Sequence, residues 1–234
     1  MMFQCLPAPE CDVREFSLMA YAFLITLKLF IAVRLLRMYR ANRELNIVGA
    51  IGMMFAFLGV GRILGVYFDY YLTAMNTGLY ALHFGFYKIA MGVPAIGIGF
   101  FLYAAERSVL NGKDRYACLI GYIIVNAIGF SMPEITLLER ITPISGVFLG
   151  FIPVGYIYLI WKSKGPMRTQ TLFILAGFVF YVLGSFIIGE FWVALLMPTF
   201  GSPYTVHLFS VGLRVVGILL INQGFSSRSP GLTK

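Results

Sequence analysis

The chain has 234 residues, of which 59% are hydrophobic and only 12% are charged, and its mean hydropathy is +0.84. A soluble domain carries about 25% charged residues, so this composition excludes a soluble globular protein. Seven spanning helices of about 20 residues each would use roughly 140 residues and leave no room for a separate soluble domain. We expect an all-α integral membrane protein that crosses the cell membrane several times.

Seven apolar segments follow one another, each bounded by charges or turn residues. They are residues 14–38, 46–72, 78–106, 116–134, 143–162, 168–197 and 203–225. The polar N-terminal stretch lacks the basic region of a cleavable signal. The predicted organisation is an extracellular tail over 1–13, a single seven-helix transmembrane domain over 14–225, and a cytoplasmic tail over 226–234.

The basic residues alternate between connections and so predict the orientation. The connections after the first, third and fifth segments, with the C-terminal tail, contain Arg34, Arg37, Arg40, Arg43, Arg107, Lys113, Arg115, Lys162, Lys164, Arg168, Arg228 and Lys234. The opposite side contains two basic residues and most of the acids: Arg14, Arg140, Glu10, Asp12, Glu15, Asp69, Glu134, Glu139 and Glu190. Because basic residues in short loops stay cytoplasmic, the N-terminus is predicted outside and the C-terminus inside. The net charge of +8 then reflects topology and contact with anionic lipid, and no nucleic-acid partner is expected.

A shift of about 125 positions aligns the two halves of the chain. The matched pairs include Gly52 with Gly177, Gly59 with Gly184, Tyr80 with Tyr204 and His83 with His207. An even number of spans separates the two copies, so both have the same orientation. This pattern predicts a possible parallel repeat of helices one to three and five to seven around a linking fourth helix.

Ionisable residues within spans are costly and usually face a bundle interior or a cavity. Lys28 lies within about two turns of Arg34 and is expected to snorkel to the cytoplasmic interface. Arg62, Lys88 and Arg214 each lie about ten residues from the outer end of a segment, or roughly 15 Å deep. Snorkelling over that distance is difficult, so these three cations point to the outer half of the bundle.

Helical spacing groups further polar residues with these cations. Arg62 and Asp69 are two turns apart, His207, Ser210 and Arg214 share a face, and so do Tyr80, His83 and Tyr87. The predicted ligand-binding residues are Arg62, Asp69, His83, Tyr87, Lys88, Glu190, His207 and Arg214. One interpretation is structural, with Arg62–Asp69 and Arg214–Glu190 as interhelical ion pairs. The other is an outer-half polar cavity for a small anionic or zwitterionic ligand.

Cofactor and metal chemistry have little support in the sequence. No cofactor and no metal site are expected, although His83 and His207 would fit the axial ligands of a b-type haem if they lie at matched depth. Cys5 and Cys11 lie in the outer tail, where a disulfide and two free thiols are both open. No enzyme motif occurs, so the chain is not expected to be an enzyme.

The segments resemble known membrane families. The size, the outer N-terminus and the three-plus-one-plus-three plan are similar to the grouping of microbial rhodopsins and small sugar transporters. A rhodopsin has a Schiff-base lysine in its last helix, where this chain has Arg214, so retinal is not expected. The sugar transporters have a proline in the first helix of each repeat, which Pro153 matches but Lys28 does not.

A second resemblance covers most of the chain. The stretches FAFLGVGRILGVYFDYY, LHFGFYKIAMGVPAIGIGFFLYAAERSV and VGYIYLIWKSKGPMRTQTLFILAGFVFYVLG resemble uncharacterised archaeal seven-helix proteins. Those proteins are similar to the membrane sensor regions found ahead of some histidine kinases. The resemblance implies a sensory, receptor-like module. Only SSRSPGLTK follows Phe225, so a signal is expected to pass to a partner protein.

Three functions follow from these observations. The first is a receptor-like sensor that binds a small ligand from outside and shifts the states of the bundle. The second is a small-solute transporter with a midplane site between the repeats. The third is an accessory subunit of a membrane complex. The oligomeric state is left open.

Overall fold

The described chain is built from helices alone. The computed structural model describes residues 8–43, 46–74, 76–109, 116–188 and 190–226, and no strand occurs among them. Six of its helical segments are long and apolar enough to cross a membrane, and the apolar helix Ala117–Ser131 is shorter. The prediction of a multi-pass, all-helical membrane protein is therefore confirmed.

Contacts between residues divide the chain into two compact units. The first unit comprises Met1–Leu27 and Tyr156–Lys234, and the second unit comprises Lys28–Gly155. Helix α1 (Ala8–Ala41) contributes its first part to the first unit and its second part to the second unit.

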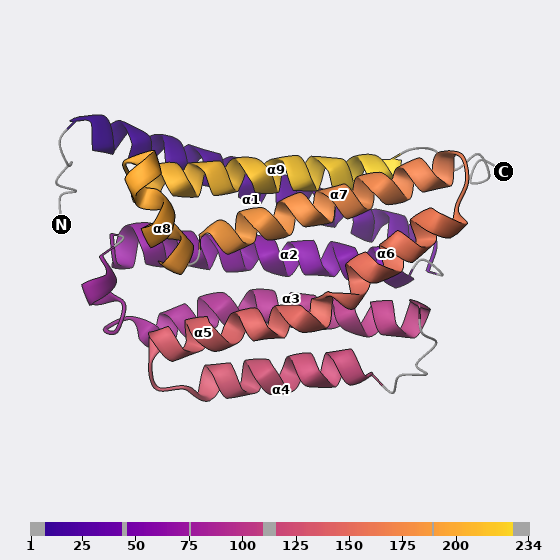
Figure 1. Ribbon diagram of the computed structural model, residues 1–234, viewed down its shortest axis with the longest axis horizontal. Helices are drawn as coiled ribbons and strands as arrows, with labels where there is room; N and C mark the ends of the chain where they lie inside the picture. Colours follow the sequence, from indigo (N-terminus) through magenta and orange to yellow (C-terminus); the bar gives the residue numbers. More distant parts are fainter. Residues whose placement is uncertain (1–7, 44–45, 75, 110–115, 189, 227–234) are drawn as a thin grey trace. The chain divides into compact units, whose positions relative to one another are not determined.

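The first unit is centred on a close pair of helices, α7 (Pro166–Ile187) and α9 (Pro203–Ser226), which lie side by side in Figure 1. Between them in the chain lies the shorter α8 (Glu190–Phe200). A Cβ atom added at Gly177 would lie 2.5 Å from the carbonyl oxygen of Gly217. The two backbones therefore touch at a point where only glycine fits, as at other close helix crossings in membranes.

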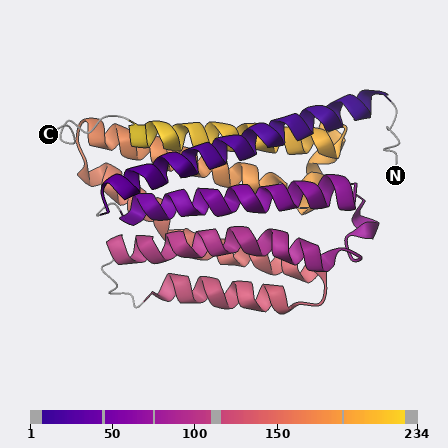
Figure 2. The same cartoon turned by 180° about the vertical axis from the view of Figure 1, so that it is seen from behind.

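The second unit contains the remaining elements, which can be followed from behind in Figure 2. They are α2 (Asn46–Val66), the π-helix η1 (Tyr67–Leu72), the 3₁₀ turn η2 (Thr77–Leu79), α3 (Phe84–Val109), α4 (Ala117–Ser131), α5 (Ile135–Ser145), the 3₁₀ turn η3 (Gly146–Leu149) and the start of α6 (Phe151–Lys162). Helices α2 and α3 pack closely, because Pro94 of α3 fills the space where Gly61 has no side chain. Pro94 lies inside α3 and serves this contact.

Several predicted segment boundaries differ from the structure. The first helix begins at Ala8 rather than at 14, so part of the predicted tail over 1–13 is helical. The third segment begins at Phe84, because the residues before it form the 3₁₀ turn and further turns. The fifth begins at Ile135 rather than at 143, because Leu138 is buried and seats this turn against α4. The sixth segment was predicted as one helix to residue 197, but α7 ends at Ile187 and α8 is a separate helix.

The matched glycines of the proposed repeat pack differently in the two copies. Gly52 lies against Leu35 and Leu36 of α1, so the second helix of the first copy packs on its first helix. Its counterpart Gly177 lies against Gly217, so the second helix of the other copy packs on its third. The repeat stays a prediction, and these glycines give it no support.

Candidate functional site

Arg62 and Asp69 of the second unit face each other, as their spacing suggested. Arg62 Nη1 lies 3.9 Å from Asp69 Oδ2, and the two side chains are 11% and 16% exposed. Gly65, one turn after Arg62, lies beside the guanidinium, and a Cβ atom there would be in ordinary van der Waals contact with Nη1, at 3.5 Å. The separation is longer than a hydrogen bond, so the contact is an ion pair at loose geometry.

Asp69 belongs to the π-helical segment that ends the second span. The backbone N–H and the hydroxyl of Thr73 both donate to the carbonyl of Phe68, at 3.0 Å each, and thereby close the segment. Thr73 and Phe68 are fully buried. Short π-helical turns are often found at functional sites, where they re-aim side chains. Here the turn sets the direction of Asp69.

A second polar pair lies beside the first. The Tyr87 hydroxyl on α3 donates a hydrogen bond of 2.8 Å to Glu139 Oε1 on α5. The Tyr87 ring packs on Phe68 with centroids 5.1 Å apart, and Phe68 is the neighbour of Asp69. We call Arg62, Asp69, Tyr87 and Glu139 the Arg62 cluster. It joins the end of the second span, the start of α3 and the middle of α5 within one unit.

Glu139 was predicted only as an acid of an outer connection. The predicted fifth segment started after it, whereas helix α5 already begins at Ile135. The three-residue spacing of Ile135, Leu138 and Ile141 marks an apolar helix face and was the signal available in the sequence. The carboxylate in the middle of that helix obscured it.

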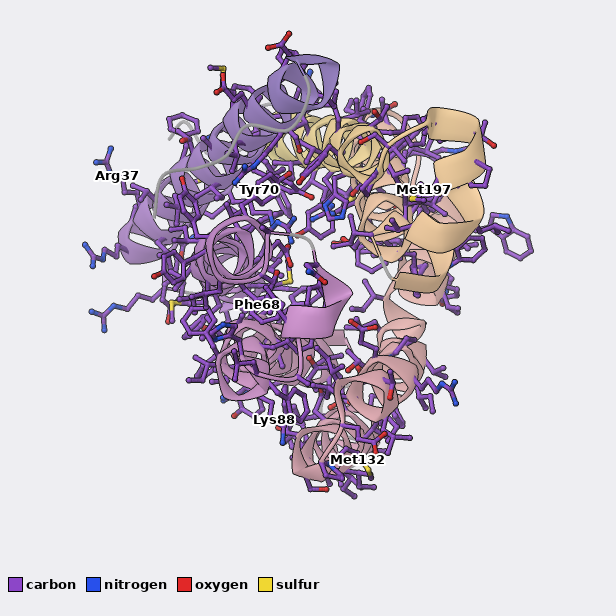
Figure 3. The ribbon with its side chains drawn as sticks, turned by 90° about the vertical axis from the view of Figure 1, so that its left-hand side faces the viewer. Arg37, Phe68, Tyr70, Lys88, Met132 and Met197 are labelled. Atoms are coloured by element: carbon purple, nitrogen blue, oxygen red, sulfur yellow. The ribbon has the colours of Figure 1, made fainter. Side chains whose placement is uncertain are left out.

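Lys88 does not lie as deep as the sequence predicted. Lys88 is the fifth residue of α3, about 6 Å from the start of the helix, so its predicted depth of ten residues is wrong. Its Nζ lies 4.4 Å from the centroid of the Phe84 ring, a cation–π contact near the helix end. Figure 3 labels Lys88 together with Phe68 of the same unit. His83 directly precedes α3, and its carbonyl oxygen accepts the N–H of Tyr87 at 3.1 Å, so the two residues are one helical turn apart.

Arg214 of the first unit is held by its own helix and by α7. Its Nε donates to the Gly184 carbonyl at 3.3 Å, and its Nη2 donates to Ser210 Oγ. Ser210 in turn donates to the same carbonyl at 2.6 Å. Arg214 is 3% exposed and Ser210 is fully buried. The predicted shared face is confirmed for these two residues, and the contacts bind α9 to α7.

His207 continues this row of polar residues on α9. Its Nδ1 lies 2.8 Å from the hydroxyl of Tyr21 on α1, and the two rings meet edge to face at 6.1 Å. Tyr21 is fully buried and His207 is 7% exposed. Tyr21 was absent from the predicted site, because a tyrosine within an apolar span carries no signal of its own.

The predicted set is therefore divided between the units. Arg62, Asp69, His83, Tyr87 and Lys88 belong to the second unit, and the others belong to the first. Glu190 is the first residue of α8 and Cys11 lies on α1, but the side chains of both are outside the described part of the structure, and so is the whole of Cys5. Haem ligation by His83 and His207 stays a prediction, because the two histidines belong to different units.

Lys28 corrects a further expectation. Its side chain is 2% exposed, and Nζ lies 3.5 Å from the carbonyl oxygen of Leu58. Leu58 is the thirteenth residue of α2, about 18 Å from the start of that helix. The amine therefore reaches inward to the α2 backbone, and the prediction that it snorkels to the interface is wrong.

Glu106 is a buried acid that sequence analysis did not select. It is fully buried near the end of α3, and its Oε1 accepts the backbone N–H of Cys118 at 2.8 Å and of Leu119 at 3.3 Å. These are two of the N–H groups at the start of α4, which no turn of the helix can satisfy. A carboxylate also interacts favourably with the positive end of a helix. The role of Glu106 is to fix α4 against α3.

Two cavities were characterised, and both lie away from the predicted ligand-binding residues. The larger, about 470 Å³, is lined by residues from the end of α1 and the start of α2. The smaller, about 200 Å³, is lined by residues of α7 and by Gln223 of α9. None of the eight predicted ligand-binding residues lines either cavity.

Comparison with known proteins gives this chain no relative. No protein-family model, no curated protein and no solved structure matches it.

Proposed function

We propose that the chain is a receptor-like membrane sensor that binds a small anionic or zwitterionic ligand at the Arg62 cluster. In this proposal seven spans cross the membrane, the N-terminus is outside, and the C-terminus is cytoplasmic. The observation that carries the proposal is the pairing of Arg62 with Asp69 and of Tyr87 with Glu139 around the packed Phe68 ring. Polar pairs of this kind inside a span usually mark a functional site.

The chemistry of the cluster suits a zwitterion. A ligand carboxylate at hydrogen-bond distance would interact with the Arg62 guanidinium more strongly than Asp69 does across 3.9 Å. A ligand ammonium would be attracted to the carboxylates of Asp69 and Glu139. Arg214 is a weaker candidate, since Ser210 and the Gly184 carbonyl hold its guanidinium in the contact between α7 and α9.

The π-helical turn supplies an element that a ligand can shift. Asp69 lies within Tyr67–Leu72, so a change in its partner alters the forces on that turn. A ligand that binds one arrangement of the turn better than another moves the population toward it. In this proposal the change is passed through α2 and α3 to a partner protein.

The proposal is tested by ligand-dependent stabilisation of the purified full chain in lipid nanodiscs. The probes are single amino acids and small mono- and dicarboxylates, each tested for an increase in the melting temperature. We expect one class to stabilise the wild type. At a hundredfold excess over its dissociation constant, a ligand contributes about 2.7 kcal/mol.

Variants make the test specific to the cluster. We expect Arg62→Gln and Glu139→Gln to lose the stabilisation. The control, Arg140→Gln, removes the same charge as Arg62→Gln from an exposed position beside Glu139 and should keep it. No stabilisation by any probe, or equal loss in the control, would contradict the proposal. Uptake of the stabilising solute into proteoliposomes, abolished by Arg62→Gln, would replace the sensor with a transporter.

A further inference from the structure

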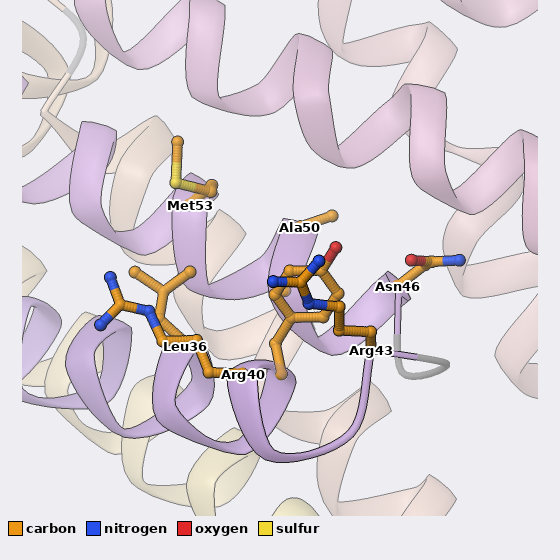
Figure 4. A pocket seen from close by; sticks show the side chains of 8 residues that line it. Leu36, Arg40, Arg43, Asn46, Ala50 and Met53 are labelled. Carbon is orange, nitrogen blue, oxygen red and sulfur yellow. The ribbon is translucent and has the colours of Figure 1, made fainter.

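The larger cavity lies at the other end of α2 from the Arg62 cluster. Its lining residues come from the last turns of α1, the connection and the first turns of α2: Leu36, Tyr39, Arg40, Arg43, Asn46, Gly49, Ala50 and Met53. Figure 4 shows Arg40 and Arg43 on the α1 side, with Asn46, Ala50 and Met53 on the α2 side. Arg62 is sixteen residues beyond the start of α2, or about 24 Å along the helix. The cavity is therefore independent of the proposed sensor site.

The lining combines two kinds of chemistry. Arg40 and Arg43 contribute two guanidinium groups, Asn46 contributes an amide, and none of the eight lining residues is acidic. Leu36 and Met53 form apolar walls on the two helices. An arginine guanidinium binds a phosphate group through two N–H···O hydrogen bonds at once. A free phosphate ion would make no favourable contact with the apolar walls, whereas a phosphate that carries a hydrocarbon chain would.

The start of α2 adds to the positive charge. The helix begins at Asn46, so its first backbone N–H groups lie at the cavity and carry the positive end of the helix dipole. Backbone N–H groups at such an end bind phosphate readily. The two arginines and the helix start therefore favour the same ligand charge.

Close packing holds the Tyr39 ring in the cavity wall. A Cβ atom added at Gly49 would lie 2.7 Å from Tyr39 Cγ and 2.9 Å from both Cδ atoms. The ring thus lies flat on the α2 backbone at a place where only glycine leaves room. Gly49→Ala would displace the ring and reshape the cavity without changing any charge.

We propose that this cavity binds the phosphate headgroup of an anionic phospholipid, with the first part of an acyl chain against Leu36 and Met53. The cavity lies at the ends of two apolar spans, Asp12–Ala41 and Asn46–Leu72, where a headgroup meets acyl chains. Basic pockets between helices at a membrane surface recognise anionic headgroups in this way. The site would tie the connection between α1 and α2 to the membrane surface.

Native mass spectrometry of the full chain, released from nanodiscs, measures the lipid that stays bound. The lipid probes are phosphatidylglycerol and phosphatidylcholine, and the soluble probe is glycerol 3-phosphate. We expect the wild type to retain phosphatidylglycerol in preference to phosphatidylcholine. Replacement of both arginines, Arg40→Gln with Arg43→Gln, should weaken phosphatidylglycerol binding about 30-fold, which is about fivefold for each charge.

Two further variants separate a built site from general attraction to the membrane. Arg37 lies on α1, as Arg40 does. Its side chain projects away from α1 in Figure 3, and Arg37 does not line the cavity. Because Arg37 is exposed and outside the lining, its charge acts on a bound headgroup only through solvent, and Arg37→Gln should weaken binding by no more than about twofold. Gly49→Ala keeps every charge and should weaken binding as the arginine variants do.

Three outcomes would overturn the proposal. Equal losses in Arg37→Gln and Arg43→Gln, or an unchanged affinity in Gly49→Ala, would mean general attraction. Equal binding of glycerol 3-phosphate and phosphatidylglycerol would identify a site for a soluble phosphate compound. If Gly49→Ala lowers the melting temperature in phosphatidylcholine, the substitution disturbs the fold itself. The comparison of Arg43→Gln with Arg37→Gln then distinguishes a built site from general attraction.

Discussion

Ser210 lies between the Arg214 guanidinium and the Gly184 carbonyl in the contact between α7 and α9. Its hydroxyl donates to the Gly184 carbonyl and accepts from Arg214, and it is fully buried. Arg214 lies about 16 Å along α9 from Pro203, so water is not at hand to replace a lost partner. Ser210 therefore keeps a buried cation satisfied and ties α7 to α9.

We predict that Ser210→Ala lowers stability by about 1–2 kcal/mol, because a buried donor loses its acceptor and a carbonyl loses a donor. For a chain of this size that is a fall of about 2–8 °C in the melting temperature. The matched control is Ser185→Ala, whose hydroxyl bonds only to Tyr181 of the same helix. Equal melting temperatures for the two variants would contradict this role of Ser210.

The residues of the site were predicted in part. The seven-residue spacing of Arg62 and Asp69 was enough to bring them together, because both lie on one continuous helical segment. Lys88 was placed too deep, because the start of α3 was predicted six residues early. Partners on other helices, such as Tyr21 for His207 and Glu139 for Tyr87, depend on packing that spacing along one helix does not encode.

At the scale of elements, Glu106 links two helices of the second unit. Its carboxylate, fully buried on α3, accepts the N–H groups of Cys118 and Leu119 at the start of α4. Helix α4 has 15 residues, about 22 Å, which is less than the roughly 30 Å of a bilayer core. A short helix depends more on fixed ends.

We predict that Glu106→Gln destabilises the chain by about 1 kcal/mol, because the negative charge at the positive end of α4 is lost and an amide N–H₂ replaces Oε2, which lies 3.4 Å from the N–H of Leu119. Hydrogen exchange should show faster exchange of the amides of Cys118 and Leu119. Glu134→Gln is the control, because Glu134 precedes α5 but makes no capping hydrogen bond. Unchanged exchange at the start of α4 in Glu106→Gln would refute the capping role.

The breaks in the helices were less predictable than the helices themselves. Each apolar segment was found because its length and lack of charge are properties of the sequence. The interruptions at Gly146–Leu149 and after Ile187 lie in sequence that is as apolar as the helices beside them. Hydropathy therefore does not mark these breaks, which depend on local backbone geometry and on the packing of each unit.

At the scale of the whole molecule, the distribution of basic residues determines which end of the bundle is predicted to face outward. Six long apolar helices make the chain a multi-pass membrane protein. The uneven distribution of basic residues predicts an outer N-terminus, which places the Arg62 cluster toward the outside and the Arg40–Arg43 cavity toward the cytoplasm. Both proposed sites thus depend on one orientation.

Cysteine accessibility tests this central claim most directly. In a chain with Cys5, Cys11 and Cys118 replaced by serine, a single cysteine is placed by Gly65→Cys, beside Arg62, or by Arg43→Cys at the other end of α2. A membrane-impermeant thiol reagent is then added to the outside of intact cells. The account predicts that Gly65→Cys is labelled from outside, and Arg43→Cys only after the membrane is permeabilised. Labelling of Arg43→Cys in intact cells, with Gly65→Cys reached only after permeabilisation, would contradict it.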